Sequence, residues 1–323
     1  MNILTLSSIG FVLSLIAVIA VMPSFIKYLK KKNINQVTSE YALEEFKQKE
    51  KTPIMGGLLF VVLPILVYIV ISFKSLGDKR IQFVLLSYIL FCSVGFIDDS
   101  LIIRSHSNEG LSPKTRLIME FVYTLGLFII YRDVIPMQIS IPFTDFAIKF
   151  NPVLFFVFMS LLYMAEANAV NFTDGMDGLC AGVSFFAILP FVCLAYKAGY
   201  NNVVVFLACI LGGLIGYLKY NFHPAKIFMG DSGSLALGAL FASLGILCDK
   251  CVALFFIGGV FVIEMFCVLV QQIAVRAFHK RVFSYTPIHY AFVIKGYKEE
   301  KIVLSFYALE IVLAVIGLFI GLH

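Results

Sequence analysis

Ten long apolar stretches run through this chain, and they limit its fold more than any other feature. A helix needs about 20 apolar residues to cross the hydrocarbon core of a bilayer. The stretches cover residues 3–29, 53–73, 81–97, 117–131, 151–167, 179–197, 202–219, 233–248, 252–276 and 302–322. Of the 323 residues, 60% are hydrophobic and only 14% are charged, whereas a soluble domain has about 25% charged residues. We therefore expect an all-α integral membrane protein with about ten transmembrane helices, forming a single domain over residues 1–323.

The charged residues between these stretches indicate how the chain is oriented in the membrane. The odd-numbered loops hold 17 of the 25 Lys and Arg, and the even-numbered loops hold seven. Because Lys and Arg concentrate in cytoplasmic loops, the odd loops are predicted to face the cytoplasm. An even number of spans then puts both termini on the extracytoplasmic side. The apolar run at the start of the chain continues to Ile26, and basic residues follow it from Lys27 onward, which indicates a retained helix and not a cleaved signal.

The segment 132–150 differs from the other loops. Its sequence, RDVIPMQISIPFTDFAIKF, contains two prolines and alternates apolar with polar residues. Such alternation is typical of short strands. We predict a short extracytoplasmic β-hairpin in this segment.

Polar residues that can carry chemistry gather in the loops predicted to be cytoplasmic. They lie in FIDDS at the end of the third stretch, in NAVNFTDGMDGLCAG at 168–182, in YNFHPAKIFMGDSGSLALG at 220–238, and in the loop before the last stretch. The residues concerned are Asp98, Asp99, Asn168, Asn171, Asp174, Asp177, Asn221, Asp231 and His289. All of these loops can meet on one side of the membrane, so we predict an active-site cleft at the cytoplasmic surface.

Each acidic motif also has a purely structural explanation. Asp-Gly pairs form turns, so Asp174 and Asp177 could belong to a polar turn between two helices. Asp231 or Ser232 could cap the helix expected to start near residue 233. The FIDDS pair could simply end a helix at the membrane surface, although Asp is costly near hydrocarbon.

Taken together, the acidic motifs favour a divalent cation. Carboxylate oxygens without a Cys and His cluster suit Mg²⁺, which binds carboxylates together with substrate phosphates. We predict Asp231 and Asp99 as its ligands. Basic residues from other loops would hold the phosphates, namely Lys49, Lys114, Arg116 and Arg281. This combination suits phosphoryl transfer, in which catalysis depends mainly on positioning and charge neutralisation.

Glu264 and His289 complete the candidate set. Glu264 falls inside an apolar stretch, where an ionisable residue indicates either a functional role or a buried polar partner such as Gln271. His289 follows Pro287 in the motif TPIHYAF, in a long loop where a histidine can equally be solvated.

The motifs resemble one known family along most of the chain. FIDDS, NAVNFTDGMDGLCAG, YNFHPAKIFMGDSGSLALG, GGVFVIE and TPIHYAFVIKGY are similar to motifs of the polyprenyl-phosphate N-acetylhexosamine-1-phosphate transferases, in the same order from about residue 49 to 300. KTPIMGG, and KRVF followed by PIH, resemble the branch that uses UDP-MurNAc-pentapeptide (UDP-N-acetylmuramoyl-pentapeptide). The resemblance implies a Mg²⁺-dependent homodimer in the bacterial cytoplasmic membrane. It further implies that UDP-MurNAc-pentapeptide and undecaprenyl phosphate, a membrane lipid, give lipid I and UMP in peptidoglycan synthesis, with no nucleic-acid partner.

The resemblance also implies roles for single residues. Asp98 and Asp99 match the aspartate pair of the family, and Asp231 matches its Mg²⁺ ligand. With His289, which matches the first residue of a histidine run, they form the predicted catalytic set. The predicted substrate-binding set is Lys49, Asn168, Asn171, Asp174, Asp177, Asn221, Phe228, Lys114 and Glu264.

Four positions depart from the usual pattern of the family, and three alternatives to the implied function remain. Ile54 stands where the family has Thr, Ile102 where it has Lys, and Tyr290 with Ala291 where it has two histidines, so the roles of those side chains do not transfer. The alternatives are a sister transferase that moves another N-acetylhexosamine-1-phosphate such as GlcNAc-1-phosphate, a membrane prenyltransferase, and a transporter. The stretch DDSLI lacks the second, spaced acid that a prenyltransferase needs. A transporter would carry charges along its spans, whereas here they gather at one face.

Overall fold

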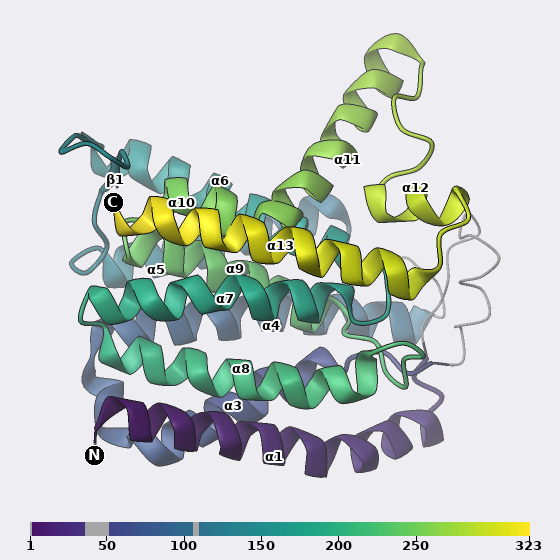
Figure 1. Ribbon diagram of the computed structural model, residues 1–323, viewed down its shortest axis with the longest axis horizontal. Helices are drawn as coiled ribbons and strands as arrows, with labels where there is room; N and C mark the ends of the chain where they lie inside the picture. Colours follow the sequence, from purple (N-terminus) through teal and green to yellow (C-terminus); the bar gives the residue numbers. More distant parts are fainter. Residues whose placement is uncertain (1, 36–51, 106–109) are drawn as a thin grey trace.

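The protein folds as a bundle of long helices that run side by side (Figure 1). This computed structural model describes residues 2–35, 52–105 and 110–323. The helices are α1 (Ile3–Lys31), α3 (Gly57–Ser72) continued by the 3₁₀ helix η2 (Phe73–Gly77), α4 (Lys79–Ser105), α5 (Pro113–Tyr131), α6 (Pro152–Thr173), α7 (Leu179–Lys197), α8 (Asn201–Asn221), α9 (Asp231–Leu247), α10 (Cys251–Ile257), α11 (Gly259–Phe278), α12 (Ile288–Ile294) and α13 (Glu299–Leu322).

Helix α9 forms the centre of the bundle. Every residue from Ser232 to Leu247 is buried. The helix is rich in Gly, Ala and Ser, and small residues of this kind let neighbouring helices approach closely in a membrane. It packs mainly against α4 and α6, with further contacts to α3 and α10. This packing places the N-terminus of α9, where Asp231 lies, between the ends of α4 and α6.

Eight helices within the described ranges are long and apolar enough to cross a membrane, which confirms an all-α, multi-pass membrane protein. Two other predicted spans fall short of that description. Helix α9 has only 17 residues, and α5 carries Lys114, Arg116 and Glu120 in its first half. Both nevertheless pack within the bundle, α5 against α4 and α6.

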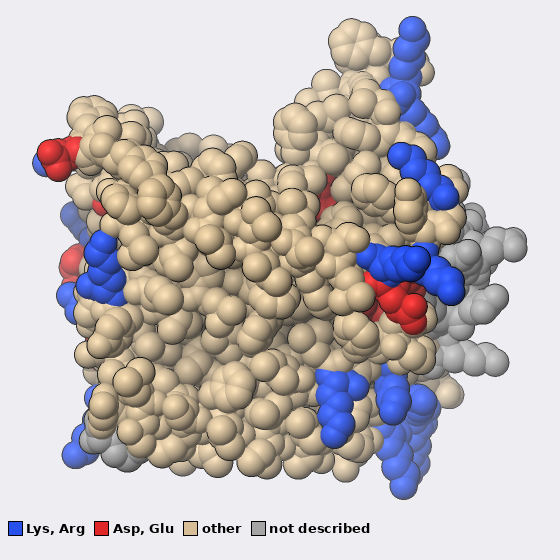
Figure 2. Space-filling model, in the orientation of Figure 1, with Lys and Arg blue, Asp and Glu red and all other residues tan. Residues whose placement is uncertain are grey.

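The two ends of the bundle differ in what they carry. The N- and C-termini lie at the same end (Figure 1), as an even number of spans requires. The predicted hairpin is present, with β1 (Gln138–Ser140) antiparallel to β2 (Ala147–Lys149), and it lies at this terminal end. Lys and Arg occur at both ends, and the face between them in Figure 2 is almost free of charged side chains. We call the opposite end, which carries the loops 174–178 and 222–230, the site end.

The prediction of one continuous helix over 252–276 is wrong. The chain breaks at Gly258, which separates α10 from α11, and α11 points away from the bundle (Figure 1). Two consecutive glycines favour a break because each is a poor helix former. A break inside a membrane exposes N–H groups that need acceptors. The buried side chain of Glu310 on α13 supplies one, because its Oε2 accepts the Val260 N–H at 3.1 Å.

Candidate active site

Asp231, the first residue of α9, is held in place by Asp99 on α4. The Asp99 carboxylate is 1% exposed, and its two oxygens accept the N–H groups of Asp231 at 3.0 Å and Ser232 at 3.1 Å. Thus neither Asp231 nor Ser232 caps α9 with its own side chain, and a residue 132 positions earlier does so instead. A carboxylate is favourable there because the N-terminus of a helix carries a partial positive charge.

Two glycines make this contact possible. Gly230, just before α9, has φ +77°, a conformation that other residues adopt only with strain. Gly95 on α4 faces the backbone of Asp231 so closely that a Cβ at this position would overlap the carbonyl group of Asp231. The absence of a side chain at residue 95 therefore sets the distance between α4 and the start of α9.

The side chain of Asp231 binds residues from two further helices. Its Oδ1 accepts a hydrogen bond from Nδ2 of Asn171 on α6 at 2.8 Å, and Asn171 also donates to Oγ of Ser234 at 3.0 Å. Its Oδ2 pairs with Nη1 of Arg116 on α5 at 3.0 Å. Both oxygens of Asp231 are therefore engaged by positively charged or polar donors, and we call Asp231, Asp99, Asn171 and Arg116 the Asp231 centre.

Asp98 lies beside this centre and binds a different element. Its Oδ1 accepts the N–H of Leu111 at 2.8 Å, just before α5. The side chain is 6% exposed. Adjacent positions on α4 therefore reach opposite ways, Asp99 to α9 and Asp98 to the segment that enters α5.

The acidic loop, residues 174–178, approaches the same centre from the end of α6. Burial and the nearby charge of Asp231 raise the pKa of Asp174 to about 7, although the Gly230 N–H that hydrogen-bonds to it acts in the opposite direction. The Asp174 carboxyl therefore changes its charge near neutral pH. Such a position is typical of functional sites.

Four side chains hold the backbone of the acidic loop. The hydroxyl of Tyr290 on α12 donates to the carbonyl oxygen of Gly175 at 2.9 Å, and that of Tyr307 on α13 donates to the carbonyl oxygen of Gly178 at 2.6 Å. Oδ1 of Asn221 accepts the Gly178 N–H at 3.1 Å. Oε1 of Glu299 accepts the N–H of Asp177 at 2.8 Å. The loop is thus positioned by the C-terminal part of the chain and not only by its own turn.

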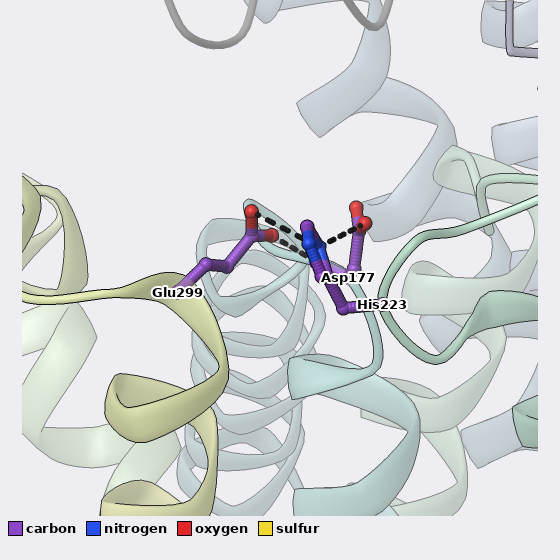
Figure 3. Close-up of side chains that lie close together, drawn as sticks. All are labelled: Asp177, His223 and Glu299. Atoms are coloured by element: carbon purple, nitrogen blue, oxygen red, sulfur yellow. Dashed lines mark hydrogen bonds and ion pairs between the residues drawn. The ribbon is translucent and has the colours of Figure 1, made fainter.

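Asp177, His223 and Glu299 form a second polar cluster next to the acidic loop (Figure 3). Oδ2 of Asp177 lies 3.0 Å from Nδ1 of His223 and also accepts the Ala225 N–H at 3.0 Å, while Oε2 of Glu299 lies 3.6 Å from the same Nδ1. The three residues border a cavity of about 560 Å³, which is also lined by Thr52, Phe228 and Tyr297. Their ligand atoms lie within 4.8 Å of one another, so a metal could bind here by spacing, but the hydrogen bonds already account for the arrangement.

Glu264 on α11 and His289 on α12 form a fully buried pair. Oε1 of Glu264 lies 3.0 Å from Nδ1 of His289, and Oε2 accepts the Ile288 N–H at 2.7 Å. Nε2 of His289 has no hydrogen-bond partner among the described residues and faces Gly175 of the acidic loop. A carboxylate on Nδ1 favours the tautomer with a lone pair on Nε2, so His289 can accept a proton or hydrogen bond at that atom.

Most of the predicted site residues come together at the site end, and a few do not. Phe228 lines the cavity of the second cluster, and Asn221 binds the backbone of the acidic loop. Nδ2 of Asn168 instead donates to the carbonyl oxygen of Met164 in its own helix, and Lys114 is exposed on the first turn of α5. Lys49 lies outside the described residues.

The structure brings into the site several residues that were not among the predicted site residues. Glu120, His223 and Glu299 bind Arg116 or Asp177, which were predicted. Tyr290 and Tyr307 bind the backbone of the acidic loop. Only Glu120 had a sequence signal, because it stands four positions after Arg116 and so on the same face of α5.

Comparisons with known proteins identify the family of the chain. Residues 81–249, which span α4 to the end of α9, match the family described as glycosyl transferase family 4. The chain is 35% identical to the phospho-N-acetylmuramoyl-pentapeptide-transferase of Staphylococcus carnosus, over 98% of this chain and 99% of that protein. It belongs to glycosyl transferase family 4.

Other members of the family are similarly close. Proteins with the same name from Halalkalibacterium halodurans and Campylobacter lari are 32% and 33% identical. The alignments cover 96% of this chain in both cases, and 95% and 92% of those proteins. This member of glycosyl transferase family 4 is therefore a transferase and a multi-pass membrane protein. Its bacterial relatives align over nearly the whole chain.

Proposed function

We propose that the protein transfers phospho-N-acetylmuramoyl-pentapeptide from UDP-MurNAc-pentapeptide to undecaprenyl phosphate, giving lipid I and UMP for peptidoglycan synthesis. The name of relatives that align over nearly the whole chain supports this substrate pair. The observation that carries the proposal is the Asp231 centre, where four helices bring acidic, amide and basic groups to one point. Such a set can hold phosphates and the cation that accompanies them.

We propose Mg²⁺ as the cofactor, with Asp231 and Asp99 as the predicted ligands. The residues fit such a cation because they offer only oxygen atoms, and because the positive charge of Arg116 already rests on Asp231 where a cation would bind. Asp99 uses both oxygens for the N-terminus of α9 in this structure, so it also fixes the backbone of Asp231. When bound, Mg²⁺ would neutralise charge between two phosphorylated substrates.

The other residues have roles that follow from their positions. Asp98 orients the phosphate of the lipid or takes a proton from it, next to Asp99. Asp177 and Phe228 border the cavity. They receive the nucleotide together with Asn221, which binds the backbone of the acidic loop. The exposed Lys114, and Lys49 as predicted from sequence, attract phosphates. Glu264 orients His289 so that Nε2 faces the acidic loop.

The proposed reaction is a single displacement. An oxygen of the lipid phosphate bonds to the β-phosphorus of the UDP-sugar, and the bond from that phosphorus to UMP breaks. A phosphate monoester has a second pKa of about 6, so the attacking group is largely dianionic at pH 7 and needs little help from a base. The alternative is a covalent route in which Asp98 attacks first and forms an aspartyl-phosphate. Isolation of a phosphosugar–enzyme in the absence of lipid would support that route against ours.

The experiment that tests the function is direct. Purified protein is incubated with UDP-MurNAc-pentapeptide, undecaprenyl phosphate and Mg²⁺, and UMP is measured. We expect UMP only when all three are present, and its loss when EDTA is added. UMP release with UDP-GlcNAc but not with the pentapeptide substrate would instead assign the protein to a sister transferase.

We further propose that the protein is a homodimer and that the site end faces the cytoplasm. Cross-linking would test the homodimer, and labelling of the loops in intact cells would test the orientation.

A further inference from the structure

Arg116 shares its guanidinium group between two carboxylates. Nη1 lies 3.0 Å from Oδ2 of Asp231, and Nε lies 3.2 Å from Oε1 of Glu120, one turn later on α5. The side chain of Arg116 is 16% exposed and that of Glu120 is fully buried. A buried carboxylate without a positive partner is strongly unfavourable, so Glu120 needs Arg116 whatever else Arg116 binds.

The pair between Arg116 and Glu120 is only half formed. Nη2 of Arg116 and Oε2 of Glu120 are buried, and neither has a hydrogen-bond partner among the residues that the structure describes. Nε and Nη2 lie along one edge of the guanidinium plane, and this edge matches the two oxygens of a carboxylate in a bidentate pair. A small rotation of the guanidinium group would complete that pair, and it would move Nη1 off Asp231.

A metal ion on Asp231 would favour this movement. Both oxygens of Asp231 are occupied, Oδ1 by Asn171 and Oδ2 by Arg116. A divalent cation binds carboxylate oxygen at about 2.1 Å, so it would lie within a few ångströms of a guanidinium group that keeps its present position. Two positive charges at that separation repel each other strongly in a partly buried site. Cation binding therefore disfavours the Arg116–Asp231 pair.

We propose that Arg116 is a placeholder cation, which neutralises Asp231 until the metal arrives and then turns onto Glu120. After the turn, Nη1 faces the centre without a carboxylate partner and binds a phosphate oxygen of the incoming substrate. Glu120 is the positioning residue that receives the guanidinium edge. This inference rests on the proposed metal role of Asp231.

Binding of Mn²⁺ to the full-length protein without substrates tests the inference. The free ion is counted by its paramagnetic resonance signal, for the wild type and for Arg116→Gln, Glu120→Gln and Asp231→Asn. We expect Arg116→Gln to bind Mn²⁺ about tenfold more tightly, within the usual range of coupling between two ligands of one site. Glu120→Gln should bind it more weakly, because Arg116 loses its alternative partner and stays on Asp231. General damage to the fold would weaken binding in both variants, so opposite signs exclude it.

The controls separate this inference from the proposed function. Arg104→Gln removes the same charge from an exposed position at the end of α4 and should leave Mn²⁺ affinity unchanged. Arg116→Lys keeps a charge without the planar edge, so its Mn²⁺ affinity should stay near the wild-type value while UMP release falls. If Asp231→Asn loses the ion but Arg116→Gln binds it no better than the wild type, the placeholder role is wrong and the metal site stands. If Asp231→Asn binds Mn²⁺ like the wild type, the metal role of Asp231 is itself wrong.

Discussion

The two ends of α9 each present an aspartate to another part of the chain, and they do so in different ways. At the site end, Asp231 binds Arg116 and Asn171, which come from two other helices. At the terminal end, Asp249 follows the helix and accepts three hydrogen bonds from the hairpin strand β1. They come from Nε2 of Gln138 at 2.8 Å, and from the N–H and Oγ of Ser140 at 3.0 and 2.6 Å.

The two aspartates differ in whether their hydrogen-bonding partners can be displaced by a ligand. The donors on Asp249 are neutral and all belong to one short strand, so they fasten the hairpin to the bundle. The strongest partner of Asp231 is a charged side chain that has a second carboxylate within reach. Asp231 is neutralised by a charge that can move away, so it can exchange that charge for a ligand. Asp249 is satisfied by fixed neutral donors, so its role is structural.

The largest expected effect is on turnover at the site end. Asp231→Asn should lower UMP release about 10³-fold, because a metal ligand contributes several kcal/mol of charge stabilisation in the transition state. The start of α9 should stay in place, since Asp99 binds the backbone of residue 231 and not its side chain. Full turnover in this variant would remove Asp231 from the mechanism.

The next largest effect concerns the approach of α4 to α9. Gly95→Ala would place a Cβ against the carbonyl group of Asp231 and should destabilise the protein by about 1–3 kcal/mol, as overpacking does. It should also lower turnover, because Asp99 would lose its place at the N-terminus of α9. Gly126→Ala on α5 is the matched control, since a Cβ there meets open space. Thermal unfolding and UMP release of both variants measure the contrast, and equal behaviour would contradict it.

At the terminal end, the effect should fall on stability alone. Asp249→Asn exchanges an acceptor of three hydrogen bonds for an amide with one acceptor oxygen, at a cost of about 1–3 kcal/mol. Turnover per folded molecule should stay within about twofold of the wild type. Loss of activity without loss of stability would mean that the two ends of α9 are not as different as their partners indicate.

The smallest expected effect is a pH dependence near the site. The pKa of Asp174 is raised to about 7 in the folded protein, mainly by burial and then by Asp231. Folding therefore favours the protonated carboxyl, so this group's stabilising contribution is full below pH 4 and is lost as the pH rises through about 7. Melting temperatures between pH 5 and pH 8 should decline less steeply in Asp174→Asn than in the wild type. Identical slopes would show that Asp174 does not titrate in this range.

Local patterns in the sequence predicted most of the fold and the composition of the site. Apolar stretches of bilayer length gave the helices, the alternation in 132–150 gave the hairpin, and loop parity placed the acidic motifs at one end. These features depend on neighbouring residues or on simple alternation of sides. The break at Gly258 also had a local signal in the Gly-Gly pair, but the apolar stretch around it is long enough to hide it.

The pairs within the site could not be predicted in the same way. Arg116 and Asp231 are 115 positions apart, and Glu299 binds a backbone N–H 122 positions earlier. Such contacts depend on how helices pack, and on glycines such as Gly95 that decide how closely they approach. Tyr290 is an example. The sequence shows only that a tyrosine stands where the family has a histidine, whereas in the structure its hydroxyl binds the carbonyl oxygen of Gly175.

The hydrogen bond from Val260 to Glu310 determines more than the start of α11. Glu264 stands one helical turn beyond Val260, and it is the residue that binds both His289 and the backbone of Ile288. The buried carboxylate of Glu310 on α13 therefore fixes the start of the helix that carries Glu264. A shift of α13 at Glu310 would move Glu264 and, with it, the candidate catalytic residue His289.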